Sequence, residues 1–121
     1  MSKRILAVDD QEDNRRILRD LLTSAGYEVS EAMTGEEALA QAEALVPDLI
    51  LMDIQLPGID GYEATRRIKA NPALARIPLI VVTSYALSGD EAKAMAAGAD
   101  AYVSKPFSPR TLLAKVREYL S

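Results

Sequence analysis

Short apolar runs alternate with helix-like segments along the whole chain. The apolar runs occupy residues 5–8, 27–32, 49–52, 79–82 and 101–103. The runs at 5–8, 49–52 and 79–82 are apolar at every position, which is typical of parallel strands covered by helices on both faces. The run at 27–32 alternates between apolar and polar residues, so we expect it at an edge of the sheet.

A segment with helical character follows each apolar run. After the first run, apolar residues recur with helical spacing at Ile17, Leu18, Leu21 and Leu22, and Gly26 is a natural stop. The other helices are marked by a capping residue or proline at the start and, in most cases, a glycine or proline at the end. These signals are Thr34 with Glu37 and Pro47, Asp60 with Glu63 and Asn71-Pro72, Ser88-Gly89-Asp90-Glu91 and Gly98, and Ser108-Pro109.

Five strand–helix units with short connections predict an α/β fold with one doubly wound parallel sheet and right-handed crossovers. A length of 121 residues suits about one domain, so we expect residues 1–121 to form a single unit. The sequence contains no linker-like or low-complexity tract.

Composition excludes several classes of function. The net charge is −4 with no basic block, which argues against direct DNA binding. No apolar run approaches the ~20 residues of a membrane helix, so we expect no membrane association. The chain has no cysteine, which is compatible with a cytoplasmic location, and no histidine, so any phosphohistidine must come from another protein or domain.

Polar residues stand directly after four of the apolar runs. They are Asp9-Asp10, Asp53, Thr83-Ser84 and Ser104-Lys105. The carboxyl ends of parallel strands share one edge of a sheet, where ligands bind, so we expect these side chains to gather there.

The three aspartates predict a site for a hard cation. Asp9 and Asp10 are adjacent, so we expect at most one of them to point straight into the site, beside Asp53. Crowded carboxylates either take up a proton or bind a cation, and ligation by oxygen alone favours Mg²⁺. A backbone carbonyl after Asp53, that of Gln55, is a further candidate ligand. The alternative for the doublet is that Asp9 or Asp10 caps the following helix.

The sequence leaves two interpretations open for each of Lys105, Thr83 and Tyr102. Lys105 is suited to a phosphoryl oxygen or a carboxylate, although it can also be an ordinary exposed lysine. Thr83 is either a strand residue or a hydroxyl donor to phosphate. Tyr102 is either an edge aromatic or a reporter that rotates near Thr83. The Lys105-Pro106 bond can be cis or trans on sequence grounds.

These elements together resemble the receiver domains of two-component response regulators, the CheY-like superfamily, over essentially the whole chain. The resemblance rests on Asp9-Asp10, the segment Leu-Met-Asp53-Ile-Gln-Leu-Pro-Gly-Ile-Asp-Gly, Val-Val-Thr83-Ser84 and Ser104-Lys105-Pro106-Phe107. The Asp53 segment and residues 84–91 look most like single-domain receivers of the DivK type. The resemblance implies a flavodoxin-like sheet with strand order 2-1-3-4-5 and five helices.

The resemblance also implies a metal site and a phosphoacceptor. Asp53 is expected to accept a phosphoryl group from the phosphohistidine of a sensor histidine kinase or phosphotransfer protein. Asp10, Asp53 and the Gln55 carbonyl are expected to ligate Mg²⁺, with Asp9 acting through water.

Lys105, Thr83 and Ser84 are expected to bind the phosphoryl group, and Thr83 and Tyr102 to act as the switch. Ser84 and the bulky Tyr85 are mild departures from the family pattern, because receivers often carry alanine at the position of Ser84.

The output is expected to be contact with a downstream protein. We place this switchable face on residues 89–97, 101–103 and 109–120, where small alanines permit close docking. The chain is not expected to be an enzyme beyond its own phosphoryl transfer and slow dephosphorylation.

Two other functions remain open from the sequence. The first is a phosphatase with an aspartyl-phosphate intermediate on Asp53 or Asp9. It is disfavoured because Gln55 stands where such enzymes carry an acid/base aspartate, and because the chain has no cap insertion. The second is a receiver-like scaffold that is never phosphorylated, which the intact acidic set disfavours.

Overall fold

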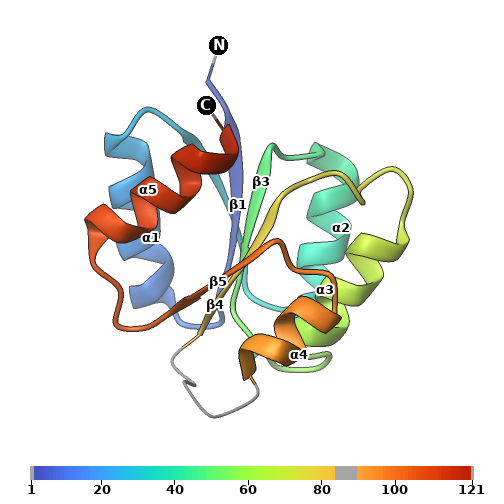
Figure 1. The fold of residues 1–121 in the computed structure, drawn as a ribbon. Coiled ribbons are helices and arrows are strands. Elements are labelled where there is room, and N and C mark those ends of the chain that lie inside the picture. Colours follow the sequence, from blue (N-terminus) through green and yellow to red (C-terminus); the bar gives the residue numbers. More distant parts are fainter. Residues whose placement is uncertain (1, 84–89, 121) are drawn as a thin grey trace.

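The computed structural model describes residues 2–83 and 90–120, in which strands and helices alternate (Figure 1). The strands are β1 (Arg4–Val8), β2 (Glu28–Ala32), β3 (Leu49–Met52), β4 (Leu79–Thr83) and β5 (Ala101–Ser104). The helices are α1 (Glu12–Ser24), α2 (Gly35–Leu45), α3 (Gly61–Ala70), α4 (Asp90–Ala96) and α5 (Pro109–Leu120). The alternation predicted from the sequence is confirmed.

The strands form one parallel sheet in the order β2-β1-β3-β4-β5. This is the order of a CheY-like flavodoxin fold, and it places β2 at an edge as the alternating pattern predicted. In the register of the central strands, Val8 of β1 lies opposite Met52 of β3. The residues that follow them, Asp9 and Asp53, therefore emerge side by side at the carboxyl edge.

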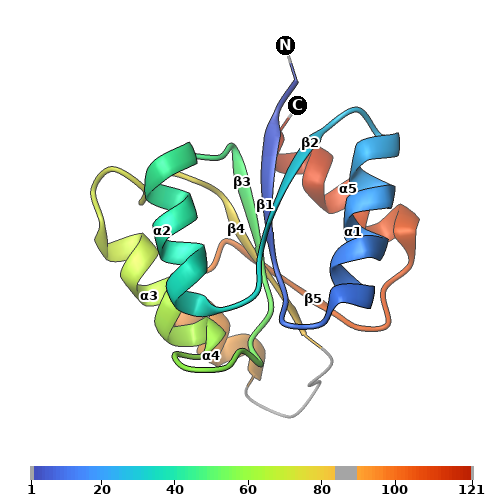
Figure 2. The same ribbon diagram turned by 180° about the vertical axis from the view of Figure 1, so that it is seen from behind.

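Helices cover both faces of the sheet. Figures 1 and 2 show α1 and α5 on one face and α2, α3 and α4 on the other. Each layer has its own apolar core, and the side chains at 5–8, 49–52 and 79–82 are all buried between the layers. None of the helices in the described part of the chain is both long and apolar enough to cross a membrane.

Thr34 and Asp60, which were predicted as capping residues, are the N-caps of α2 and α3. The N–H of Glu37 donates to the Thr34 hydroxyl at 3.0 Å, and the N–H of Glu63 donates to the Asp60 carboxylate at 2.9 Å. The Glu37 carboxylate accepts from the side chain of Gln41, one turn further along the helix, so the capping box at Thr34 is only half formed.

The predicted caps of the last two helices are described only in part. The Ser108 hydroxyl accepts a hydrogen bond from the N–H of Thr111 at 3.0 Å, so Ser108 caps α5 as predicted. Of the segment predicted to open α4, Ser88 and Gly89 lie outside the described residues.

The buried face of α1 differs from the prediction at one position. Leu18 and Leu22 are buried and Leu21 is half-buried, but the Ile17 residue is 56% exposed. Arg15 is buried in the same stripe, three residues before Leu18. The inward face of the helix therefore carries a guanidinium, which donates to the Asp9 carbonyl and to the Glu31 carboxylate.

Candidate functional site

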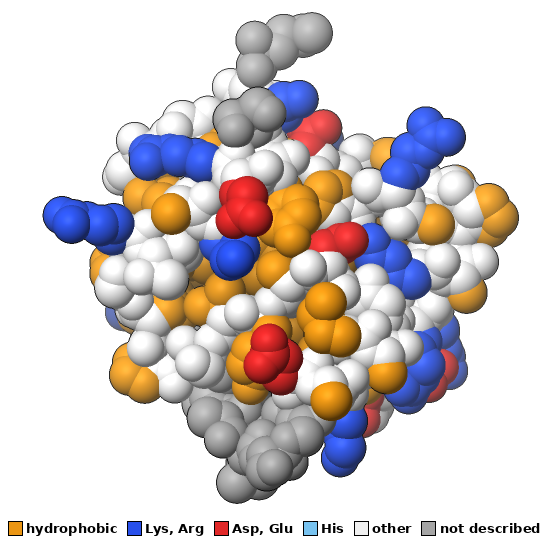
Figure 3. Space-filling view, viewed as in Figure 1, with side chains coloured by type: hydrophobic (Ala, Val, Ile, Leu, Met, Phe, Trp, Pro, Cys, Tyr) orange, Lys and Arg blue, Asp and Glu red, His pale blue; other side chains and the backbone are white. Residues whose placement is uncertain are grey.

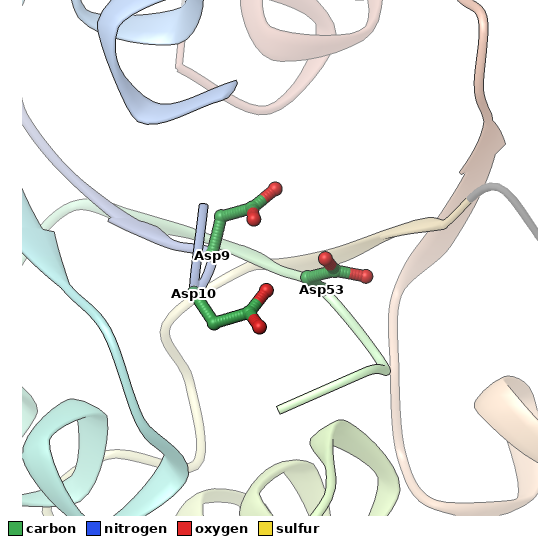
Figure 4. A group of neighbouring side chains, drawn as sticks. All are labelled: Asp9, Asp10 and Asp53. Carbon is green, nitrogen blue, oxygen red and sulfur yellow. The ribbon is translucent and has the colours of Figure 1, made fainter. Parts of the chain in front are cut away.

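Three carboxylates meet at the carboxyl ends of β1 and β3. Figure 4 shows the side chains of Asp9, Asp10 and Asp53 directed toward the same region. Each offers an oxygen, and these oxygens lie within 4.8 Å of one another. Asp9 and Asp53 are buried, whereas Asp10 is exposed.

The expectation that at most one of Asp9 and Asp10 points into the site was therefore wrong. β1 ends at Val8, so the two aspartates lie beyond the strand, and the strict alternation of strand side chains no longer applies to them. Asp9 and Asp10 can consequently both contribute oxygens on one side of the chain.

The buried Asp9 carboxylate accepts hydrogen bonds from three donors. Its Oδ1 accepts the backbone N–H of Gln11 at 3.0 Å and, more weakly, Asn14 Nδ2 at 3.5 Å. Its Oδ2 accepts Lys105 Nζ at 2.9 Å. The N-cap of α1 is Gln11, so the alternative in which Asp9 or Asp10 caps this helix is not borne out.

Lys105 lies between two of the acids. Its Nζ is 2.9 Å from Asp9 Oδ2 and 3.4 Å from Asp53 Oδ2, and its side chain is 16% exposed. Lys105 thus pairs with both carboxylates, and the shorter contact is with Asp9. The Lys105-Pro106 peptide bond is cis.

The buried position of Asp53 is unfavourable to its ionised form. Burial raises the pKa of the Asp53 carboxyl above its ordinary value; the Lys105 ammonium opposes this rise, and the Asp9 carboxylate adds to it. The N–H of Gln55 also donates to Asp53 Oδ1 at 3.3 Å and favours the anion. The net rise means that Lys105 and the Gln55 N–H do not fully compensate the burial of the Asp53 charge, so a further cation would be bound favourably.

An open cleft of about 760 Å³ gives access to these groups. Asp10, Asp53, Gln55 and Lys105 line it together with Gln11, Asn14, Leu56 and Pro57. The candidate metal ligands at this cleft are the carboxylates of Asp9, Asp10 and Asp53, whose oxygens lie within 4.8 Å of one another. Such a group of oxygen ligands fits a hard divalent cation that retains several waters.

The predicted phosphate-binding and switch residues lie on β4, just after it, and on β5. Thr83 is the last residue of β4 and lies opposite Ser104 in the register. The Thr83 side chain and Ser84 lie outside the described residues, so their roles stay predictions. Tyr102 is half-buried in β5 and packs against the core under α2, α3 and α4.

Sequence reasoning missed three residues that shape the site. Arg15 donates to the Asp9 carbonyl at 2.8 Å and to the carboxylate of Glu31 in β2 at 3.2 Å. Gly61 packs so closely on the loop after β3 that a Cβ there would collide with the Asp53 carbonyl. The available signal for Arg15 was its helical spacing with Leu18 and Leu22, which places a charged residue on the buried face.

Comparison with known proteins agrees with this geometry. The family model of the response regulator receiver domain matches residues 5–117. The polar-differentiation response regulator DivK of Brucella ovis is 42% identical over 120 residues, which cover 99% of this chain and 98% of the relative.

Solved structures are similar over the same length. A putative response regulator from Chloroflexus aurantiacus J-10-fl has a TM-score of 0.95 at 36% identity, with 99% of this chain and 98% of that chain covered. The receiver domain of sensor histidine kinase PA1611 from Pseudomonas aeruginosa PAO1 has a TM-score of 0.92 at 37% identity, with the same coverage. That domain was solved with a magnesium ion coordinated in its active-site cleft.

Receiver domains are signalling switches of two-component systems that interact with histidine kinases or phosphotransfer proteins, and the matches do not indicate a family of enzymes. The acidic edge, the strand order and the full-length similarity agree with one another. This chain belongs to the response regulator receiver domain family.

Proposed function

We propose that the protein is a phosphorylation-activated switch of a two-component phosphorelay. In this proposal Asp53 accepts a phosphoryl group from the phosphohistidine of a sensor histidine kinase or phosphotransfer protein. The observation that supports it most directly is the position of the Asp53 carboxylate, which lines an open cleft within reach of two further carboxylates and of Lys105.

The transfer is a displacement at phosphorus. A carboxylate oxygen of Asp53 attacks the phosphorus, the P–N bond to the donor imidazole breaks with its electron pair moving to nitrogen, and an acyl phosphate forms. Both reactants are anionic, so the site must neutralise charge while it aligns them. Lys105 Nζ lies 3.4 Å from Asp53 Oδ2, so its ammonium would bind an oxygen of the transferred phosphoryl group.

Asp10, Asp53 and the Gln55 carbonyl are the proposed protein ligands of Mg²⁺, with Asp9 acting through water. When bound, the cation would screen the repulsion between the carboxylates and the incoming phosphoryl group. The contacts support this division of roles, because Asp10 is exposed at the cleft while both oxygens of Asp9 already accept hydrogen bonds.

The proposed output is a change in the face formed by α4, β5 and α5. Figure 3 looks onto this face, where hydrophobic side chains lie between charged ones. Ala94 and Ala97 are buried in the core, while Ala92 and Ala96 are exposed, so half of these alanines are available for a partner. New charge at Asp53, together with movement of Thr83 and Tyr102, would bias this face between two states and so control a downstream protein.

The test is phosphorylation by acetyl phosphate with Mg²⁺, read by intact mass. We expect one added phosphoryl group on the wild type and none on Asp53→Asn. An unmodified wild-type protein would contradict the proposal and favour the receiver-like scaffold. Chemical-shift changes on adding beryllofluoride would then locate the responsive face, and changes confined to α1 and α2 would reject the assignment of α4, β5 and α5.

The phosphatase alternative makes a different prediction, namely catalytic turnover of small phosphate esters. Gln55, two residues beyond Asp53, cannot act as the general acid/base of such an enzyme, so we expect no turnover. We also propose that residues 1–121 act as one receiver domain and that the protein is cytoplasmic, where its phosphodonors would be found.

A further inference from the structure

The backbone of Asp9 is held from two sides. Its N–H donates to the carbonyl of Ala32 in β2 at 3.1 Å, and its carbonyl accepts Arg15 Nη1 at 2.8 Å. This carbonyl belongs to the peptide unit that joins Asp9 to Asp10. Its orientation therefore helps to set the direction in which the next residue, Asp10, leaves the chain.

The Arg15 guanidinium is itself fixed by an ion-pair network. Arg15 is 8% exposed, and its Nε donates to Glu31 Oε1 at 3.2 Å. The second oxygen of Glu31 accepts Arg19 Nη1 at 2.9 Å. The Glu31 carbonyl accepts Gln41 Nε2 at 2.6 Å, so this part of the edge strand is tied to α1 and α2 together.

Asp9 and Asp10 lie in the short connection between β1 and α1, outside regular secondary structure. β1 ends at Val8 and α1 begins at Glu12, so Asp9 and Asp10 belong to neither element. The Asp10 side chain is exposed, so the position of its carboxylate depends on the backbone conformation. A planar guanidinium can bind a carbonyl and a carboxylate in fixed directions at the same time, which a flexible ammonium does less well.

We propose that Arg15, anchored by Glu31, is a positioning residue for the magnesium site, because it fixes the peptide unit between Asp9 and Asp10. This inference rests on the proposed function, in which Asp10 is a direct Mg²⁺ ligand. Arg15 does not touch the cation in this scheme; it acts through the backbone of Asp9, as residues that orient metal ligands do.

The sign of the effect separates positioning from simple electrostatics. Arg15 is a positive charge close to a cation site, so its charge alone opposes Mg²⁺ binding. If charge were its main effect, removing the guanidinium would strengthen binding. If positioning dominates, removing it weakens binding despite the gain in electrostatic attraction.

The experiment measures the Mg²⁺ dissociation constant by calorimetry on the unphosphorylated full chain. We expect Arg15→Met to raise this constant by about tenfold, which is the lower end of the effect of losing a ligand-orienting partner. Arg15→Lys keeps the charge but loses the forked geometry, so it should weaken binding by about threefold to tenfold. Glu31→Gln should weaken binding by a smaller factor, because it loosens the guanidinium without removing it.

Arg16→Met is the matched control. Arg16 is the next residue of α1, is exposed, and pairs only with Asp13 among the described residues, at 3.2 Å. Its loss removes one positive charge without touching the Asp9 carbonyl, so the Mg²⁺ dissociation constant should stay within about twofold of wild type.

Thermal unfolding of each variant checks that the compared proteins are folded. If Arg15→Met does not fold, Arg15→Lys and Glu31→Gln decide the question by the same measurement. Dissociation constants equal to or below that of the wild type in the folded variants would overturn this inference alone. A wild-type protein that binds no Mg²⁺ would overturn the proposed metal site and this inference with it.

Discussion

The two ends of the sheet use aspartate in different ways. At the amino ends, Asp48 precedes β3 and Asp100 precedes β5. The Asp48 carboxylate accepts the backbone N–H of Arg4, and the Asp100 carboxylate accepts that of Leu79, each at 2.8 Å. Both carboxylates thus bind the first backbone N–H of a neighbouring strand, and they are satisfied locally.

At the carboxyl ends, Asp9 and Asp53 follow their strands and are placed differently. Their backbone N–H groups still pair with neighbouring strands, through the carbonyls of Ala32 and Val8. Their carboxylates instead converge with one another around Lys105. The two ends share the strand geometry and differ in the partners of the carboxylates. At the amino ends each carboxylate accepts a backbone N–H, whereas the three carboxylates at the carboxyl ends outnumber the one ammonium beside them, Lys105.

The largest expected effect comes from removing the ammonium at the carboxyl end. Lys105→Met should reduce the rate of phosphorylation by acetyl phosphate by roughly 10²–10³-fold, because the charge that stabilises the transferring oxygens is lost. Mg²⁺ should bind this variant at least as tightly as wild type, so the loss would not reflect an empty metal site. A time course by intact mass at saturating Mg²⁺ measures the rate, and a near-wild-type rate would remove Lys105 from the mechanism.

The matching change at the amino end should affect stability and leave the chemistry intact. Asp100→Ala leaves the N–H of Leu79 and the Lys69 ammonium without the carboxylate that binds both at 2.8 Å. The free energy of unfolding should fall by about 2 kcal/mol. Urea denaturation measures this loss, while phosphorylation of the folded protein should stay within about twofold of wild type. A large change in the phosphorylation rate would show that the two ends are not independent.

The acidic edge could be predicted because it depends on two general rules. Continuous apolar runs mark buried strands, and parallel strands bring their carboxyl ends to one edge, so Asp53 was expected beside the Asp9-Asp10 pair. The rules did not predict that both Asp9 and Asp10 point into the site, because the two residues lie beyond the end of β1. The capping residues of α2 and α3 were also readable, since a cap is a local hydrogen bond within one turn.

The details that failed depend on tertiary contacts. A charged residue such as Arg15 is expected to be exposed until its partner Glu31 is known, and β2 brings that partner from 16 residues away. Ile17 was assigned to the apolar stripe because an apolar residue on a helix normally faces the core. The isomer of the bond before Pro106 could not be read, because local sequence favours the trans form in most cases.

The burial of Asp53 should also be visible in the pH dependence of stability. The pKa of Asp53 is raised in the native state, so the folded protein binds this proton more tightly than the unfolded chain does. The contribution of this group to stability is therefore fully present below the ordinary aspartate pKa and is lost as the pH rises through the native pKa. Asp53→Asn removes the penalty, so we expect it to gain about 1 kcal/mol at neutral pH without Mg²⁺, with Lys105 limiting the gain.

The gain from Asp53→Asn should shrink as the pH falls toward about 4, and denaturation curves at several pH values measure it. Asp48→Asn is the matched control, because the Asp48 carboxylate already has a backbone donor and should yield no gain. Mg²⁺ at 100 times its dissociation constant should stabilise the wild type by about 2.7 kcal/mol and reverse the order of wild type and Asp53→Asn. A less stable Asp53→Asn in the absence of Mg²⁺ would show that the ionised Asp53 carboxylate is not penalised in the folded protein.

The smallest effect concerns the lifetime of the phosphoryl group. Gln55 is exposed and lines the cleft beside Asp53. We predict that its side chain flanks the approach of water to the phosphoryl group. Gln55→Ala should open this approach and raise the dephosphorylation rate by about threefold, which corresponds to less than 1 kcal/mol of barrier. Tyr85, for which we predict a similar influence, lies outside the described residues.

Loss of the phosphoryl group, followed by intact mass after removal of acetyl phosphate, measures this rate. Asn71→Ala is the control at the other end of the sheet, where the Asn71 side chain accepts the N–H of Ala73 within a loop. It should leave the dephosphorylation rate unchanged. Equal rates for wild type and Gln55→Ala would mean that water reaches Asp53 by another path, on which the Gln55 side chain has no influence.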